Sequence, residues 1–427
     1  MPEIAPDSYN LCPLLPGARS LRIREFKWLW IGQTVSQLGD AVYFLVFLFL
    51  AQKVSGNPAV VGTVMALAAL PFVVLGPIAG VAADKVDRRK LMAGADFASA
   101  LILAGFAAYA YFEPLPPIWL IGVMAFSLSC VNAFFMPART AAIPALVPRE
   151  LLMDANALAI ASQQLMGMIG LALSASVLGL IFQVAPAYFL LASAALNALT
   201  FAISGAFILK LPALKPETGS GAPSGKLLKD IKAGLKVVRA DIVLRLALPI
   251  TIVSNLFIAG FMVMYAAIND DWYGGRFSTL AWLEFGFAAA MVVTTLAISR
   301  ITIRRPGTTY AVATLVVGLL VAGMCWGRGY WQFMTLNVLC GVAVPFAWLS
   351  MNVYIQTAFK DEFRGRIASV WTAASVGMHP VGLAVIGPLA AWLGLANVFL
   401  VMGFGMCAAT LIGLLNRSFM RAEMPGF

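Results

Sequence analysis

The 427-residue chain is poor in charge and has a single histidine, His379. Charged residues make up 11% of the chain, less than half of their share of about 25% in soluble domains. One histidine cannot supply the HExxH motif of a zinc protease or a site with several histidine ligands. The five cysteines are scattered without a CxxC pair, so no disulfide framework is expected. We therefore expect that the protein binds no metal and no cofactor and that it is not an enzyme. An intramembrane protease that pairs Ser375 with His379 is a remote alternative.

Apolar residues, in contrast, are abundant and gather in long runs. They make up 61% of the chain, and a run of about 20 apolar residues crosses a bilayer as a helix. Twelve such runs predict an all-α integral membrane protein. The predicted spans are 25–52, 59–83, 90–112, 117–139, 152–182, 185–210, 243–267, 277–300, 309–328, 329–352, 364–389 and 391–416.

The lysines and arginines are distributed unevenly among the predicted loops. When the N-terminus and every even-numbered junction are placed on one side, only Lys53, Arg276 and Arg328 of the 29 basic residues fall on the other. Basic residues of short loops favour the cytoplasm. Both termini are therefore predicted to be cytoplasmic, in a multi-pass protein of a bacterial inner membrane. The net charge of +10 follows from this topology and attracts anionic lipid, so no nucleic-acid partner is expected.

The longest polar segment divides the twelve spans into six and six. Its first part is rich in proline, glycine and serine, a composition typical of a flexible linker. Its second part places leucines and an isoleucine at helical spacing among lysines. This basic amphipathic helix is predicted either to lie on the inner membrane surface or to lead, solvated, into the seventh span. The predicted divisions are a cytoplasmic leader at 1–24, a six-helix bundle at 25–210, a cytoplasmic linker at 211–241, a second six-helix bundle at 242–416 and a cytoplasmic tail at 417–427.

The loop between the second and third spans resembles a known motif. Residues 80–90 read Gly-Val-Ala-Ala-Asp-Lys-Val-Asp-Arg-Arg-Lys. This segment resembles the signature loop of the major facilitator superfamily, with Asp87 in place of its second glycine, and its doubled arginine is similar to that of the macrolide-efflux and enterobactin-exporter branch. The resemblance implies the major facilitator fold, with two six-helix halves, and a monomeric transporter. Further segments that resemble the same branch are 36–40, 137–139, 156–158, 363–367 and 387–389.

Polar residues follow one face of the first span. Gln33, Ser36, Gln37, Asp40 and Tyr43 recur at helical spacing, and lipid would offer that face no hydrogen-bond partners. We therefore expect this face to line a cavity. Asp40 lies about 20 Å into the span at 1.5 Å per residue, where an ionised group costs about 2.5–3.5 kcal/mol. Asp40 is predicted to carry a proton during transport; the alternative is a structural hydrogen bond to a neighbouring helix.

Polar residues of other spans complete the predicted cavity. Glu284 is predicted either to titrate or to reach the outer vestibule, and His379 either lines the cavity or packs between helices. The amides either contact substrate or fasten helices together. These further candidates are Asn132, Asn255, Glu284, Asn337 and His379.

The resemblance also implies a cytoplasmic gate. In the superfamily the signature loop clasps the two halves when the outer side is open. Asp84 would accept hydrogen bonds from the start of the eleventh span, which carries two arginines. Positive-inside topology alone is the alternative explanation for the arginines, but it leaves Asp84 unexplained. The predicted gate comprises Asp84, Arg88, Arg89, Asp96, Arg364 and Arg366.

Together these features predict a secondary transporter that works by alternating access. We expect it to export a small amphipathic organic compound, a drug or a siderophore, in exchange for protons. The fifth span lacks the Gly-Pro of many drug antiporters. Transport of a lysophospholipid, a metal or a siderophore complex, with import as a direction, therefore remains an alternative. The expected partners are a small-molecule substrate, protons and membrane lipid.

Overall fold

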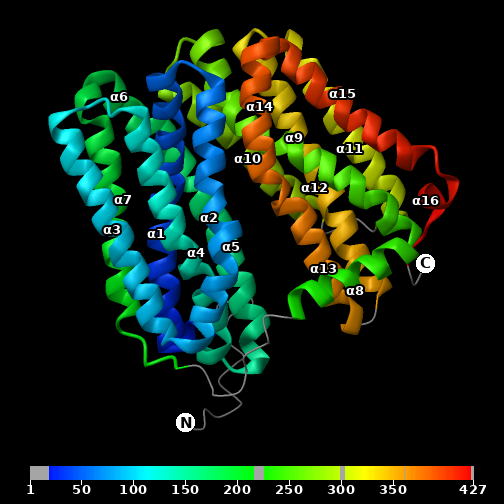
Figure 1. The fold of residues 1–427 in the computed structure, drawn as a ribbon, viewed down its shortest axis with the longest axis horizontal. Helices are drawn as coiled ribbons and strands as arrows, with labels where there is room; N and C mark the ends of the chain where they lie inside the picture. The colour runs from blue at the N-terminus through cyan, green and yellow to red at the C-terminus, as the bar shows by residue number, and fades with distance from the viewer. Residues whose placement is uncertain (1–18, 216–225, 299–302, 360, 425–427) are drawn as a thin grey trace. The chain divides into compact units, whose positions relative to one another are not determined.

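The computed structural model describes residues 19–215, 226–298, 303–359 and 361–424 (Figure 1). Within these residues all regular secondary structure is helical, and 12 helices are long and apolar enough to cross a membrane. The predicted all-α architecture with twelve spans is thus confirmed. Most predicted limits differ from the observed ones by a few residues. The third span, predicted over 90–112, runs over Arg88–Phe112, whereas the fourth, predicted over 117–139, extends to Leu146.

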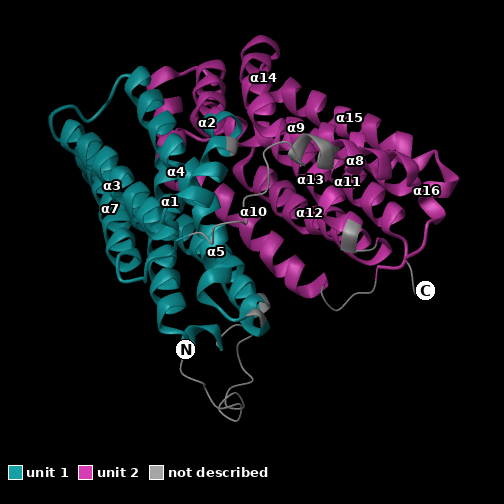
Figure 2. Cartoon of the chain, turned by 60° about the horizontal axis from the view of Figure 1, so that its bottom comes forward, with its two compact units in different colours: residues 1–46, 71–221 teal, residues 47–70, 222–427 magenta. Residues whose placement is uncertain are grey.

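The chain divides into two compact units, residues 1–46 with 71–221 and residues 47–70 with 222–427 (Figure 2). Helices α1 (Arg24–Ser55) and α2 (Pro58–Lys85) each contribute one part to each unit. The other helices of the first unit are α3 (Arg88–Phe112), α4 (Ile118–Leu146), α5 (Leu152–Leu173), α6 (Gly179–Val184) and α7 (Pro186–Ile208), with short 3-10 turns at Ser20–Arg22 and Arg149–Leu151.

The second unit holds the remaining helices. Its spans are formed by α9 to α15, and α8 precedes them. Their bounds are α8 (Lys226–Ala240), α9 (Ile242–Trp272), α10 (Phe277–Ile298), α11 (Pro306–Gly323), a 3-10 turn at Met324–Trp326, α12 (Tyr330–Ala358), α13 (Asp361–Val376), α14 (Met378–Leu393), α15 (Leu395–Leu414) and α16 (Arg417–Arg421).

Residues 47–70 belong to the second unit because two glycines allow a close backbone approach there. A Cβ at Gly62 would lie 2.5 Å from the carbonyl oxygen of Leu383, and a Cβ at Gly387 would lie 2.3 Å from that of Pro58. Side chains at these positions would force the helices apart. Small residues are enriched at such interfaces in membranes, where van der Waals contact drives helix association.

Side-chain caps fix the starts of several helices. The carboxylate of Asp87 accepts a hydrogen bond from the backbone N–H of Arg89 at 3.0 Å, and that of Asp241 accepts one from Leu244 at 2.8 Å. Each satisfies an amide that the first turn of a helix leaves without a backbone partner. The aspartate that replaces the second glycine of the signature loop therefore starts α3.

The regular α-helix of the fifth and of the eleventh span is interrupted within the span. A π-helical turn, Ser174–Leu178, separates α5 from α6, and the eleventh span is divided at Gly377 into α13 and α14. Pro380 explains the second break, since it has no N–H to donate to the carbonyl of Val376 one turn earlier. Such breaks are tolerated at membrane depth where the backbone is enclosed by protein or lines a cavity.

The predicted amphipathic helix of the linker is present as α8. It packs against α13 through Gly234, where a Cβ would lie 2.3 Å from the carbonyl oxygen of Arg366. Val238 is buried next to it, whereas Lys232 and Lys236 are exposed. The buried side of α8 therefore faces the second unit itself.

Candidate functional site

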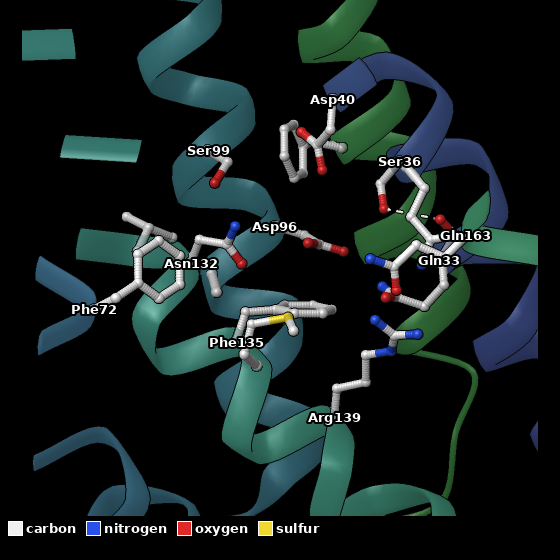
Figure 3. Close-up of a pocket in the computed structure, with 15 residues that line it drawn as sticks. Gln33, Ser36, Asp40, Phe72, Asp96, Ser99, Asn132, Phe135, Arg139 and Gln163 are labelled. Atoms are coloured by element: carbon white, nitrogen blue, oxygen red, sulfur yellow. Dashed lines mark hydrogen bonds between the residues drawn. The ribbon is translucent and has the colours of Figure 1, made fainter. Parts of the chain in front are cut away.

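A pocket of about 220 Å³ opens among the helices of the first unit (Figure 3). Side chains from α1, α2, α3, α4, α5 and α7 line it, and most of them are polar. The predicted cavity residues Gln33, Gln37, Asp40 and Asn132 are all brought together here. The full lining is Gln33, Ser36, Gln37, Asp40, Phe72, Ala95, Asp96, Ser99, Val131, Asn132, Phe135, Met136, Arg139, Gln163 and Phe201.

Asp40 faces this pocket from α1. Its side chain is accessible from the pocket, and its carboxylate accepts a hydrogen bond from the amide of Asn197 on α7. The neighbouring Gly39 makes this contact possible, because a Cβ there would lie 2.2 Å from Thr200 Oγ1 and 2.3 Å from Asn197 Oδ1. Close packing of α1 on α7 thus sets the position of the Asp40 carboxylate.

Asp96 of α3 lines the same pocket. It is only 2% exposed, and it interacts with Ser204 of α7 and, electrostatically, with Asp40. Its Oδ2 atom has no hydrogen-bond partner among the described residues. The sequence assigns Asp96 to the cytoplasmic gate, whereas the structure places it beside the predicted proton carrier.

Arg139 of α4 is the one basic residue in this lining. Figure 3 shows Asp40 and Arg139 at opposite ends of the group, with Asp96 between them. The sequence accounts for Arg139 through topology and through the resemblance of residues 137–139 to the exporter branch, and neither places Arg139 in the cavity. Its position with Asn132 and Met136 at helical spacing is the signal that would have placed it on the pocket face of α4.

The second unit contains a pocket of its own, with a volume of about 480 Å³. Asn255 and His379 line it, together with Trp348 and Trp371. His379 reaches it just after the break in the eleventh span at Gly377. This lining holds hydroxyls, amides and aromatic rings but no acidic residue, so the carboxylates of the two pockets described here all belong to the first unit.

Three predicted cavity residues do not line either of these pockets. Tyr43 is buried and donates its hydroxyl hydrogen to Met124 Sδ at 2.6 Å. Asn337 is fully buried; it accepts a hydrogen bond from Tyr265 and donates one to the carbonyl of Leu283 at 2.8 Å. These contacts make Asn337 a fastener of α9, α10 and α12.

Glu284 lies in the same cluster. It is 7% exposed and sits close enough to Tyr265 to interact with it electrostatically. Its Oε1 atom has no hydrogen-bond partner among the described residues. Glu284 is therefore enclosed by the helices of the second unit.

The predicted gate arginines bind carbonyl groups close to them in the fold. Arg88 donates to the carbonyls of Ala83 at 3.2 Å and Ala141 at 3.0 Å, and Arg89 donates to that of Leu211 at 3.0 Å. Asp87 accepts a further hydrogen bond from the N–H of Leu214. The doubled arginine thus ties together the ends of α2, α4 and α7 in the first unit.

The other gate residues are placed as follows. Asp84 is exposed at the end of α2 and has no hydrogen-bond or ion-pair partner among the described residues. In the second unit Arg364 donates from Nε to the carbonyl of Phe359 at 2.8 Å, and Arg366 lies where α13 packs on α8.

Among the described residues no three His, Cys, Asp or Glu side chains gather as a metal site would require.

Comparison with known proteins assigns the chain to a family. The family model described as "Transmembrane secretion effector" matches residues 17–423, almost the entire chain. The chain belongs to the major facilitator superfamily. This transporter is therefore a multi-pass protein of the bacterial inner membrane that carries a small molecule, and it is not an enzyme.

Relatives of this transporter include proteins named for efflux. It is 26% identical over 403 residues to macrolide efflux protein A of Streptococcus pyogenes, covering 92% of this chain and 96% of that one. It is 28% identical over 354 residues to the enterobactin exporter EntS of Shigella boydii serotype 18, covering 77% and 76%.

Solved structures show the same fold at low identity. The nucleoside transporter NupG superposes with a TM-score of 0.70 at 14% identity, covering 93% of this chain and 99% of that one. A POT family transporter in complex with 5-aminolevulinic acid superposes with a TM-score of 0.67 at 13% identity, covering 93% and 97%. The predicted major facilitator fold is confirmed.

Proposed function

We propose that this transporter exports a small amphipathic organic compound by alternating access, driven by protons that bind in the pocket of Asp40 and Asp96. The observation that carries the proposal is the placement of two carboxyl groups in one pocket inside the membrane-spanning region. Ionisable residues at that depth are costly and generally serve transport. Neither Asp40 nor Asp96 belongs to an ion pair among the described residues.

Charge balance supports an exchange of proton and substrate at this site. Two ionised carboxylates in one pocket repel each other, and the lining offers one arginine, Arg139, to compensate them. A proton on one carboxyl group removes the excess negative charge. When the proton leaves, the carboxylate is ready to accept a hydrogen bond or a positive charge from the substrate.

The lining also supports an amphipathic substrate. Phe72, Phe135 and Phe201 offer apolar surface, while amides and hydroxyls of the same pocket offer hydrogen bonds. Small-molecule sites commonly combine apolar walls with a few polar groups that fix orientation. The names of the relatives make macrolides and enterobactin the first compounds to test. Lysophospholipids, metal complexes and import remain alternatives within the same fold.

We include the cytoplasmic clasp in the proposal. Arg88 and Arg89 are engaged with carbonyls of their own unit, which leaves the exposed carboxylate of Asp84 as the acceptor that the loop would offer to the start of the eleventh span. Asp84→Asn is then expected to favour the inward-open state. Cysteine crosslinking between the two halves at their cytoplasmic ends, compared with wild type, measures that shift.

Transport by the purified protein in proteoliposomes with an imposed pH gradient tests the proposed proton coupling. A thermal-shift screen of drugs, siderophores and lysolipids at two pH values first selects a compound that stabilises the wild type. Asp40→Asn and Asp96→Asn are expected to abolish gradient-driven accumulation of that compound. Exchange of labelled for unlabelled compound without a gradient should continue in Asp40→Asn, because it needs no net proton movement.

Glu113→Gln is the matched control, since it removes a carboxylate that is exposed in the loop after α3. It should transport like the wild type. Suppose that the Asp40→Asn variant inserts into the membrane and has the same thermal stability as the wild type. Full gradient-driven accumulation by that variant would then exclude Asp40 from the proposed role.

A further inference from the structure

A second hollow of the second unit lies where α9 ends and where α10 and α12 begin. Its volume is about 850 Å³. Five aromatic side chains and two arginines, Arg276 and Arg328, line it, and the lining contains no acidic residue. This hollow is separate from the pocket that contains Asn255 and His379.

The two arginines are not neutralised by acidic residues. Both are exposed, and neither guanidinium group forms an ion pair with any described residue. Arg328 lies over the ring of Trp272, 5.7 Å from its centroid, which orients the side chain without compensating its charge. Asp270, in the last turn of α9, lies 4.0 Å from Lys53 instead. The hollow therefore presents two uncompensated positive charges to an incoming anion.

The aromatic residues place this hollow at a membrane boundary. Trp282 is 43% exposed and Trp331 76%, although both are large and partly apolar. Tryptophan and tyrosine at the ends of spanning helices mark the level of the lipid headgroups. Burial raises the pKa of Tyr273, so its hydroxyl stays protonated and donates to the carbonyl of Gly327 at 2.9 Å.

The hollow also has depth along the helices. Arg276 precedes α10 and Arg328 precedes α12, whereas Trp282 and Met334 lie within these helices. Counted from the first residue of each helix at 1.5 Å per residue, the latter two lie roughly 6–8 Å further toward the membrane centre. Positive charge at the boundary and apolar surface below it match a molecule with an anionic head and an apolar tail.

We propose that this hollow binds an anionic phospholipid, whose phosphate contacts Arg276 and Arg328 and whose acyl chain lies along Trp282 and Met334. In the predicted topology the lipid comes from the outer leaflet. A soluble anion would gain nothing from the exposed tryptophans, and a zwitterionic lipid would gain less from the arginines. The site is independent of the proposed transport reaction.

Native mass spectrometry of the purified, delipidated full-length protein tests this assignment. Phosphatidylglycerol and phosphatidylcholine with identical acyl chains are titrated separately, and inorganic phosphate is titrated as the soluble anion. A cation near a membrane surface contributes roughly a fivefold gain in affinity for anionic lipid. The double variant Arg276→Gln/Arg328→Gln should therefore bind phosphatidylglycerol roughly 30-fold more weakly.

Lys53→Gln/Asp270→Asn is the matched control, because it removes the third basic residue of the same predicted side, outside the hollow, together with its acidic partner, so that no carboxylate is released toward the arginines. It should bind phosphatidylglycerol like the wild type, and Trp282→Leu should weaken binding while both arginines remain. Unchanged binding by the double arginine variant would overturn the proposal. So would equal affinities for the two lipids, or displacement of phosphatidylglycerol by equimolar inorganic phosphate. Thermal unfolding of each variant confirms that the exposed substitutions leave the fold intact.

Discussion

The contact between α1 and α7 at Gly39 offers a sharp test of how Asp40 is positioned. Gly39→Ala adds a Cβ that would lie 2.2 Å from Thr200 Oγ1 and 2.3 Å from Asn197 Oδ1. An ordinary van der Waals contact is about 3.5–4.0 Å, so α1 and α7 must separate or the two side chains must turn. Either movement carries Asn197 away from the Asp40 carboxylate to which it donates.

The expected change in free energy of unfolding follows from a comparison of Gly39 with a second glycine. Overpacking of this kind costs about 1–3 kcal/mol, while alanine gains about 1 kcal/mol over glycine in a helix interior. Gly167 of α5 is helical, and a Cβ there would meet nothing within 4 Å. Gly167→Ala thus has the same gain in helix propensity without the clash. The two variants should differ in free energy of unfolding by about 1–3 kcal/mol, with Gly39→Ala the less stable.

Equilibrium unfolding in SDS, starting from detergent micelles, measures this difference. A second prediction concerns Gly39→Ala/Thr200→Ala, which removes the nearest clashing atom and should recover part of the loss, because the two positions are in contact. Proton-driven transport should fall in Gly39→Ala and not in Gly167→Ala. Equal stabilities and equal transport for the two single variants would refute the proposed role of this packing.

Two further predictions concern fastening residues. Asp87→Ala should destabilise the protein by about 1–2 kcal/mol in thermal unfolding, because it removes the cap of α3 and the acceptor for the N–H of Leu214. Asp87→Asn, which keeps an acceptor oxygen, is the control in the same assay. An equal loss of stability in both variants would contradict the capping argument. Asn337→Ala should cost about 1–3 kcal/mol by leaving buried groups without partners. Asn352→Ala, whose amide donates to the carbonyl of Trp348 on its own helix, should stay near wild type. Matching SDS unfolding curves for the two variants would argue against the role of Asn337 as a fastener.

The spans were predictable because their length and composition answer directly to the thickness of the bilayer. A polar face on α1 was predictable for a similar reason, since helical spacing and the cost of exposing amides to lipid both point into the protein. Gln33, Gln37 and Asp40 accordingly line one pocket. Tyr43 continues the spacing but lies beyond the pocket, where it packs on Met124.

The partners of the other polar residues were not predictable, because spacing reveals which face a residue occupies but not what lies opposite. Asp96 is close in sequence to the signature loop, yet α3 carries it to the pocket beside Asp40. Asn255 and Asn337 are both asparagines within apolar spans, and the sequence gives no reason to treat them differently. One lines a pocket, while the other is enclosed by Tyr265 and the carbonyl of Leu283.

A departure from the family pattern acquires a role once the structure shows which groups the residue contacts. Asp87 stands where the signature loop has a glycine, and the sequence alone gives that replacement no role. In the structure its carboxylate accepts hydrogen bonds from the amides of both Arg89 and Leu214. The amide of Leu214 lies 127 residues away in the chain, a distance that no local pattern reveals.

Proton release on substrate binding is the most direct measurement of the central claim, that proton and substrate compete in the pocket of Asp40 and Asp96. Purified protein in weakly buffered detergent solution is mixed with the compound selected by the thermal-shift screen, and a pH-sensitive dye records the protons set free. The wild type should release protons as the compound binds, and Asp40→Asn/Asp96→Asn should release none. Binding without proton release by the wild type, or undiminished release by the double variant, would contradict the account.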